Sequence, residues 1–144
     1  MATINTYLTF NGNCEEAFNF YKSIFGGEFS YFGRFGDIPP GEEMTVPDHE
    51  KNLVMHVSLP ISKETALMGS DSTADSGPVR FGNNFSVSID AASKEEADRF
   101  FIGLSKGGTV IMPMQNTFWG AYFGMFTDQF GINWMVNFDM RQPE

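Results

Sequence analysis

Residues 7–27 read YLTFNGNCEEAFNFYKSIFGG, and residues 87–108 read VSIDAASKEEADRFFIGLSKGG. The second stretch repeats the first about half a chain length later: Glu-Glu-Ala returns as Glu-Glu-Ala, and Phe-Tyr returns as Phe-Phe at the same spacing. Internal similarity of this kind indicates a structural unit that occurs twice. The chain is therefore expected to contain two copies of one motif.

Each copy predicts a strand followed by a helix. The helical stretches carry apolar residues at i, i+3, i+4 and i+7, which form one stripe on an α-helix. These residues are Ala17, Phe20, Tyr21 and Ile24 in the first copy and Ala97, Phe100, Phe101 and Leu104 in the second. Each helix begins with a capping pair, Asn13 with Glu16 and Ser93 with Glu96, and ends at a glycine pair, 26–27 and 107–108.

Three segments of strand character follow each helix, so that each half reads β-α-β-β-β. They cover residues 29–35, 53–59 and 66–68 in the first half and 109–112, 121–127 and 132–138 in the second. The predicted fold is α+β, one domain of two modules, residues 1–72 and 84–144, joined by a linker at 73–83. Residues 37–52 form a long acidic loop, which is a candidate lid.

Charge and composition exclude several classes of partner. The formal net charge is −9, and the nine Lys and Arg residues are scattered along the chain. Nucleic acids and anionic membrane surfaces require clustered basic residues, so neither is expected to bind. No apolar run approaches the 18 residues or so that a membrane helix needs. The single cysteine, Cys14, excludes an internal disulfide and is typical of a reducing cytoplasm. The expected location is cytoplasmic.

Three stretches resemble the PhnB-like branch of the vicinal-oxygen-chelate superfamily, which includes glyoxalase I, extradiol dioxygenases and bleomycin resistance proteins. They are TYLTFNGNCEEAFNFYKSIFGG, TALMGSD and TFWGAYFGMFTDQFGINWMVNF, so the resemblance covers nearly the whole chain. It implies that the two modules curl their sheets around a shared cavity, with the helices outside. It also implies a homodimer.

The resemblance implies four ligand positions for a divalent metal, on the first and last strand of each module. In this chain those positions hold Thr6, Met68 or Gly69, Asn84 or Ser86, and Met135. Divalent ions of this kind need carboxylate or imidazole ligands, and a hydroxyl, an amide and a thioether are unsuitable. No metal or other cofactor is therefore predicted, and the metal chemistry of the superfamily is in doubt here.

The chain contains two histidines, His49 and His56. His49 lies in the acidic loop, where a solvated cluster is favoured over a metal site. His56 lies in a predicted strand on the face opposite Met55, Val57 and Leu59, so it is a weak catalytic candidate and a candidate ligand contact. The expected lining of the cavity is Thr6, Leu8, Phe10, Arg34, His56, Asn84, Ser86, Trp119, Asn133 and Met135.

Two functions fit these features. The first is a cytoplasmic homodimer that binds a small organic molecule without a tightly held metal, in a pocket that is mostly apolar with a few polar groups. The alternative is a glyoxalase- or dioxygenase-like enzyme (an isomerase, lyase or transferase) that uses either a metal at an unanticipated site or His56. A pure interaction module would instead expose a large apolar patch.

Overall fold

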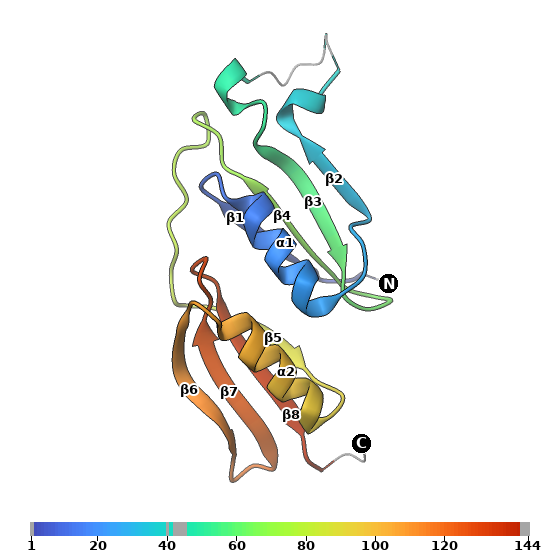
Figure 1. The fold of residues 1–144 in the computed structure, drawn as a ribbon, viewed down its shortest axis with the longest axis vertical. Coiled ribbons are helices and arrows are strands. Elements are labelled where there is room, and N and C mark those ends of the chain that lie inside the picture. Colours follow the sequence, from blue (N-terminus) through green and yellow to red (C-terminus); the bar gives the residue numbers. More distant parts are fainter. Residues whose placement is uncertain (1, 40, 42–45, 142–144) are drawn as a thin grey trace. The chain divides into compact units, whose positions relative to one another are not determined.

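The computed structural model describes residues 2–39, 41 and 46–141 and divides into two compact units, Met1–Arg80 and Phe81–Glu144. Within the described residues, each unit contains one α-helix and four strands, and Figure 1 labels these elements. The first unit contains β1 (Thr6–Phe10), α1 (Cys14–Phe25), β2 (Tyr31–Arg34), β3 (Val54–Pro60) and β4 (Ala66–Asp71). The second contains β5 (Val87–Asp90), α2 (Lys94–Ser105), β6 (Thr109–Asn116), β7 (Ala121–Thr127) and β8 (Asn133–Asp139). The predicted duplication of a β-α-β-β-β motif is confirmed.

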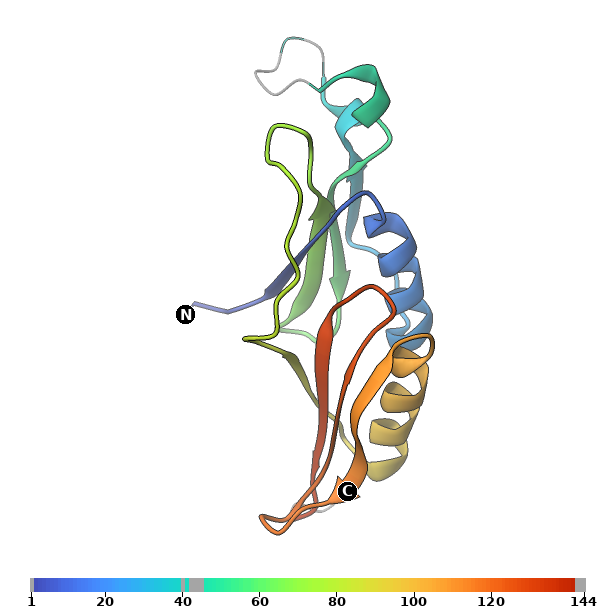
Figure 2. The ribbon, with the colours of Figure 1, turned by 90° about the vertical axis from the view of Figure 1, so that its left-hand side faces the viewer.

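The two sheets have the same topology. The strand order is β1-β4-β3-β2 in the first sheet and β5-β8-β7-β6 in the second. In each sheet the first and last strands of the motif are parallel neighbours, and the other pairs are antiparallel. Figure 2 shows that the helix of each unit covers one face of its own sheet. The opposite face of each sheet, on which no α-helix of the described residues packs, is called the open face below.

The core of the first unit lies between α1 and its sheet. Four residues of α1 are buried, namely Cys14, Ala17, Phe18 and Tyr21. The sheet contributes Leu8 and Phe10, and the Phe10 and Phe18 rings meet edge to face with centroids 6.2 Å apart. The buried stripe therefore includes Phe18, whereas the predicted stripe included Phe20 and Ile24, which are only half-buried.

The core of the second unit follows the predicted pattern. All four apolar residues of the predicted α2 stripe are buried. The alternation predicted along β8 is confirmed, because Trp134, Val136 and Phe138 are buried and the residues between them are half-buried. The Phe101 and Phe126 rings meet edge to face at 5.2 Å. Burial of large apolar side chains of this kind stabilises a unit by about 1.5–3 kcal/mol each.

Buried carboxylates fix the ends of strands in both units. Asp71, at the end of β4, accepts hydrogen bonds from the backbone N–H groups of Gly12, Cys14 and Val54 at 3.0, 2.9 and 2.9 Å. The predicted cap at Asn13 makes no side-chain hydrogen bond, so a distant aspartate takes over that role for α1. In α2 the predicted Ser93 cap is confirmed, with Ser93 Oγ accepting from the Glu96 N–H at 3.1 Å.

Asp128 has a similar role in the turn between β7 and β8. Its side chain accepts hydrogen bonds from the N–H groups of Phe130 and Ile132 and, at 2.8 Å, from Trp134 Nε1. Gly131 has φ 93°, which confirms the predicted positive φ in this turn. The motif that includes Asp128, Gly131 and Trp134 therefore has a structural explanation.

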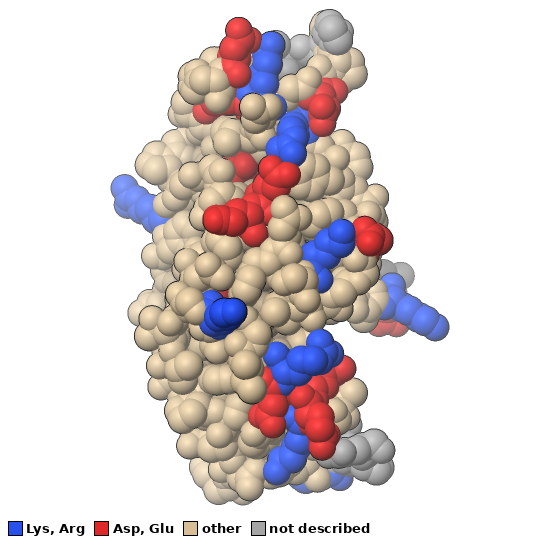
Figure 3. All heavy atoms as spheres, viewed as in Figure 1, with Lys and Arg blue, Asp and Glu red and all other residues tan. Residues whose placement is uncertain are grey.

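Acidic and basic side chains lie next to one another over each helix in Figure 3. Lys22 pairs with Glu28 at 2.9 Å, and Arg34 pairs with Glu15 at 2.8 Å.

Within the described residues, no helix combines the length and apolar character needed to cross a membrane.

Candidate functional site

Three ring side chains gather on the open face of the first sheet. Tyr7 on β1 lies opposite Met68 on β4, Met68 lies opposite Ser58 on β3, and Ser58 lies opposite Tyr31 on β2. Directly opposed residues share a face of a sheet, so this row runs across all four strands. His56 lies two residues before Ser58 and shares its face. The set Tyr7, Tyr31 and His56 is called the ring cluster below.

The ring cluster is held together by direct contacts. The Tyr7 and His56 rings are stacked with an interplanar angle of 23° and centroids 5.7 Å apart. The Tyr7 hydroxyl lies 3.3 Å from His56 Nδ1, within hydrogen-bonding distance. On the other side the Tyr31 ring lies 5.6 Å from His56 with an angle of 42°. Tyr7 and Tyr31 remain 47% and 48% exposed, so the imidazole is flanked by two accessible aromatic rings.

Gly33 makes room for the third ring. It lies opposite His56 in the β2–β3 pair. A Cβ atom at Gly33 would be 2.7 Å from the Tyr31 hydroxyl and 2.9 Å from a ring carbon of the same residue, closer than side chains approach one another. The absence of a side chain at Gly33 therefore allows Tyr31 to lie over β2, beside His56.

A β-bulge determines which residues of β3 share the face of His56. Gly33 pairs with His56 and Arg34 with Val54, so Met55 is the extra residue on β3. Val54 is buried in the core although strict alternation places it with His56. Val54 and His56 therefore lie on different faces of the sheet although they are two residues apart.

The β1 residues of the expected lining lie on the other face from His56. Leu8 and Phe10 are buried in the core with α1, and Thr6 shares their parity. Tyr7, one residue after Thr6, is the β1 side chain that contacts His56. The sequence contained a signal for this arrangement, because a strand that alternates leucine and phenylalanine with polar neighbours directs the apolar residues to the core.

The repeat explains why Tyr7 was missed. An offset of 80 residues aligns the two helices but matches Tyr7 with Val87. Val87 lies opposite the buried Trp134 and so faces α2, whereas Tyr7 faces away from α1. The same position of the repeat therefore faces away from the helix on β1 and toward the helix on β5. Gly12, with φ 102°, changes the chain direction in the first strand-to-helix connection only.

Arg34 does not join the ring cluster. Its guanidinium donates to both carboxylate oxygens of Glu15 on α1, at 3.0 and 2.8 Å, and to the Asn52 carbonyl at 2.9 Å. The hydrogen bonds and charge of Arg34 lower the pKa of the Glu15 carboxyl. Arg34 lies opposite the buried Val54, on the helix side of the sheet. Arg34, expected in the lining of the cavity with His56, therefore lies on the other face of the sheet and pairs with Glu15.

Two expected residues precede the fifth strand. β5 begins at Val87, so Asn84 and Ser86 lie in the preceding segment, where Asn84 is exposed and Ser86 half-buried. The expectation that they belong to the strand is wrong. The pairing of β5 with β8 begins at Val87, opposite Trp134, and only from there does a ladder define the faces.

Asn133 and Met135 lie on β8 on the face opposite α2. Asn133 accepts from the Thr127 hydroxyl at 2.8 Å and donates to the Gly82 carbonyl at 2.9 Å, so both ends of its amide bind neighbouring segments. Met135 lies opposite Ser88 on β5 and Met125 on β7. Met135 therefore faces a serine and a methionine on the neighbouring strands.

A row of methionines crosses the open face of the second sheet. Met112 on β6 lies opposite Met125, and Met125 lies opposite Met135. Thioether side chains are flexible and polarizable, and they adapt to apolar ligands of varied shape. This row is the counterpart of the Tyr7–Met68–Ser58–Tyr31 row in the first unit.

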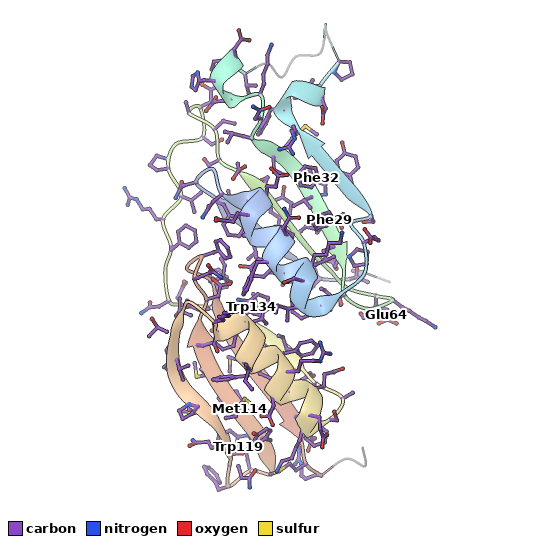
Figure 4. The ribbon with its side chains drawn as sticks, in the orientation of Figure 1. Phe29, Phe32, Glu64, Met114, Trp119 and Trp134 are labelled. Carbon is purple, nitrogen blue, oxygen red and sulfur yellow. The ribbon has the colours of Figure 1, made fainter. Side chains whose placement is uncertain are left out.

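Trp119 lies at the tip of the β6–β7 hairpin, and Figure 4 shows it at the opposite end of the second unit from Trp134. It is 51% exposed and contacts Phe118, which is 97% exposed, with ring centroids 5.0 Å apart. Its ring also lies 6.2 Å from Phe123 on β7. Trp119 therefore belongs to an exposed aromatic hairpin tip and not to the ring cluster.

The metal positions implied by the resemblance divide between the two faces of the sheets. Met68 and Met135 lie on open faces. Gly69 lies on the helix side, where an added Cβ would be 2.6 Å from the Phe18 ring. Within residues 2–39, 41 and 46–141, no group of three or more His, Cys, Asp or Glu side chains is arranged to hold a metal ion. The donors that these positions offer do not fit a divalent ion.

Cys14 and His49, two other side chains with reactive groups, lie outside the ring cluster. Cys14 is buried at the start of α1, and burial, with the nearby Asp71 and Glu15 charges, raises the pKa of its thiol. Such a thiol is a poor nucleophile at neutral pH.

His49 is exposed, and its neighbour Glu50 is buried and accepts a hydrogen bond from the Ala74 N–H at 2.8 Å. Residues 40 and 42–45 of the candidate lid lie outside the described residues.

Comparison with known proteins agrees with this architecture. Residues 3–136 match the sequence profile of the Glyoxalase/Bleomycin resistance protein/Dioxygenase superfamily. The chain belongs to this superfamily. It is 32% identical to Protein YjdN of Escherichia coli (strain K12), with 97% of each chain covered.

Similarity to solved structures indicates the branch of the superfamily. Protein PA1353 from Pseudomonas aeruginosa is 42% identical, with 96% of this chain and 98% of that chain covered and a TM-score of 0.84. The PhnB protein from Bacillus cereus is 27% identical, with 95% and 99% covered and a TM-score of 0.74. Together with the YjdN match, these similarities place the chain in the PhnB-like branch.

Proposed function

We propose that the protein binds a small organic molecule on the open face of the first sheet, at the ring cluster, without a tightly held divalent metal. The observation that carries the proposal is the position of His56 between two half-exposed tyrosine rings. Ligand sites are commonly mostly apolar with a few polar groups that orient the ligand. Aromatic rings supply the apolar surface here, and the imidazole and two phenols supply the polar groups.

The surroundings of the cluster support a site over an ordinary sheet surface. Gly33 leaves the space in which Tyr31 lies beside the imidazole, and a larger residue would displace that ring. Met68, in the row between Tyr7 and Ser58, adds an adaptable apolar side chain. An ordinary solvated sheet face does not require a glycine that makes room for an aromatic ring beside a histidine.

The proposal can be tested by nuclear magnetic resonance with ¹⁵N-labelled protein and a library of aromatic fragments. Binding fragments should shift the amide signals of residues near Tyr7, Tyr31 and His56. Replacement of Tyr31 by Leu should weaken binding by about 3- to 10-fold, because one aromatic wall contributes about 0.5–1.5 kcal/mol. His49→Asn is the matched control, because it removes the other histidine, which is exposed and outside the cluster. Fragments that shift no signal on β1, β2 or β3 would refute the proposal.

A second candidate function is a metal-free enzyme in which His56 transfers a proton. The hydrogen-bonding distance of 3.3 Å between the Tyr7 hydroxyl and His56 Nδ1 favours it, since general acid–base catalysis often uses a histidine oriented by a second polar group. Once a reaction is found, His56→Gln should lower kcat by about 100-fold or more. Unchanged turnover would remove His56 from the mechanism. The homodimer implied by the family is a separate prediction that light scattering can check.

A further inference from the structure

The ring cluster determines which nitrogen of His56 remains for a ligand. Among the described residues, the Tyr7 hydroxyl is the hydrogen-bonding partner of the imidazole, and it lies at Nδ1. Nε2 has no such partner in the described part of the chain. A ligand between the tyrosine rings would therefore meet His56 through Nε2, and the important question is whether Nε2 carries a proton.

The chemistry of the pair favours a proton on Nε2. A neutral imidazole has one N–H and one basic nitrogen, and a phenol is both a donor and a weak acceptor. The imidazole nitrogen is much more basic than a phenol oxygen, so the stronger hydrogen bond forms when Tyr7 donates to Nδ1. This arrangement leaves the proton of the neutral ring on Nε2. When the imidazole is charged, both nitrogens carry protons, so Nε2–H is a donor in both states.

We infer that the ring cluster selects conjugated compounds with an oxygen acceptor, such as an aromatic carbonyl or carboxylate. This inference rests on the proposed function, because it names the class of ligand for the same site. The flat part of the ligand would lie against Tyr7 or Tyr31, which are both half-exposed. The oxygen would accept a hydrogen bond from His56 Nε2–H. A ligand that covers this donor without accepting from it removes the donor from water with no replacement, so analogues that lack the oxygen should bind more weakly.

The first test measures the tautomer of His56 directly. Two-bond ¹H–¹⁵N spectra of the imidazole distinguish an Nε2–H from an Nδ1–H ring. The wild-type protein should show the Nε2–H form at a pH where the ring is neutral. Tyr7→Phe keeps the aromatic ring and removes the hydroxyl, so it should shift the Nδ1 signal and increase the share of the other tautomer. A wild-type protein in the Nδ1–H form would overturn the inference.

The second test compares two probes of the same shape. Acetophenone has a carbonyl where α-methylstyrene has a C=CH₂ group, and both are neutral, so the net charge of −9 affects them equally. Acetophenone is expected to bind the wild-type protein about tenfold more tightly or better. His56→Phe should abolish this difference, whereas His49→Asn should preserve it. Benzoate, a second acceptor, should shift the same signals, and benzylammonium, a donor, should bind no better than α-methylstyrene.

The outcomes test the acceptor preference and the binding function separately. Equal binding of acetophenone and α-methylstyrene at the ring cluster would overturn the acceptor preference and leave the binding function intact. Tighter binding of benzylammonium than of acetophenone that disappears in His56→Phe would also overturn it, because His56 would then recognise donors, whereas attraction of the cation by the net charge of −9 would persist in that variant. Absence of any signal shift on β1, β2 and β3 with all four probes would refute the binding function itself. A carbonyl preference that disappears in His56→Phe supports both.

Discussion

Replacement of Asp71 by Asn should destabilise the first unit by about 2–5 kcal/mol. The Asp71 carboxylate accepts hydrogen bonds from three backbone N–H groups, those of Gly12, Cys14 and Val54, at 2.9–3.0 Å. The side chain is buried, so water cannot replace it. An asparagine has a single acceptor oxygen, and its amide N–H₂ would face at least one of these N–H groups.

The magnitude follows from the two kinds of loss. A buried donor without a partner costs about 1–3 kcal/mol. Hydrogen bonds to a neutral amide are roughly half as strong as those to a carboxylate, which removes about 0.5–1 kcal/mol from each of the two bonds that remain. The total, about 2–5 kcal/mol, is a large share of the 5–15 kcal/mol or so that stabilises an ordinary domain.

Urea denaturation followed by circular dichroism measures the loss, and amide hydrogen exchange locates it. Exchange at Gly12, Cys14 and Val54 should accelerate more than exchange on α2. Asp75→Asn is the matched control, because it removes the same charge from an exposed position in the first unit. If the two variants differ by less than about 0.5 kcal/mol, then Asp71 does not join β4 to β3 and α1 in the way the hydrogen bonds indicate.

Three further predictions concern the first unit. Gly69→Ala should destabilise it by about 1–3 kcal/mol, measured by urea denaturation, because the added Cβ would lie 2.6 Å from the buried Phe18 ring. Cys14 should resist alkylation at neutral pH in the folded protein and react once the protein is unfolded in urea, because its burial raises the pKa of the thiol. Glu15→Gln should lower stability by no more than about 0.5 kcal/mol, because its pair with Arg34 is partly exposed. This small contribution should be present above the ordinary pKa of a glutamate and be lost as the pH falls through the lowered pKa of folded Glu15; its persistence in more acidic solution, in a pH series of urea denaturation, would contradict the prediction.

The sequence predicted the architecture because several local signals agreed. The repeated Glu-Glu-Ala stretches, the apolar helix stripes and the Ser93 cap all indicated the same motif, and each half folds as that motif. The predicted α1 stripe lies three residues C-terminal to the observed one, because the repeat matches Phe18 with Asp98. Asp98 is a polar partner in the second unit, where it accepts a hydrogen bond from Tyr122 at 2.6 Å, so its apolar counterpart was not recognised.

The ring cluster was only partly predictable. His56 was selected correctly for its face, because alternation along β3 holds from His56 onwards. The bulge at Met55 arises from backbone geometry, and no pattern of side chains in β3 alone encodes it. The alternation along β1, in contrast, indicated that Leu8 and Phe10 face the core and Tyr7 faces away from it. The position of the Tyr31 ring depends on Gly33, because a side chain at Gly33 would collide with that ring. Such dependence on a neighbouring strand becomes visible only after the register is known.

The two open faces differ in chemistry although the two units share a topology. Both rows contain a methionine on the last strand, Met68 in the first unit and Met135 in the second. Tyrosine lies at both ends of the first row, where the second row has Ser88 and Met112. Phenol and imidazole groups discriminate by hydrogen bonds, because a mismatched ligand leaves a polar group without a partner. Thioethers discriminate weakly. In the proposed site, selectivity for a polar group should therefore be lost when His56 or Tyr7 is replaced.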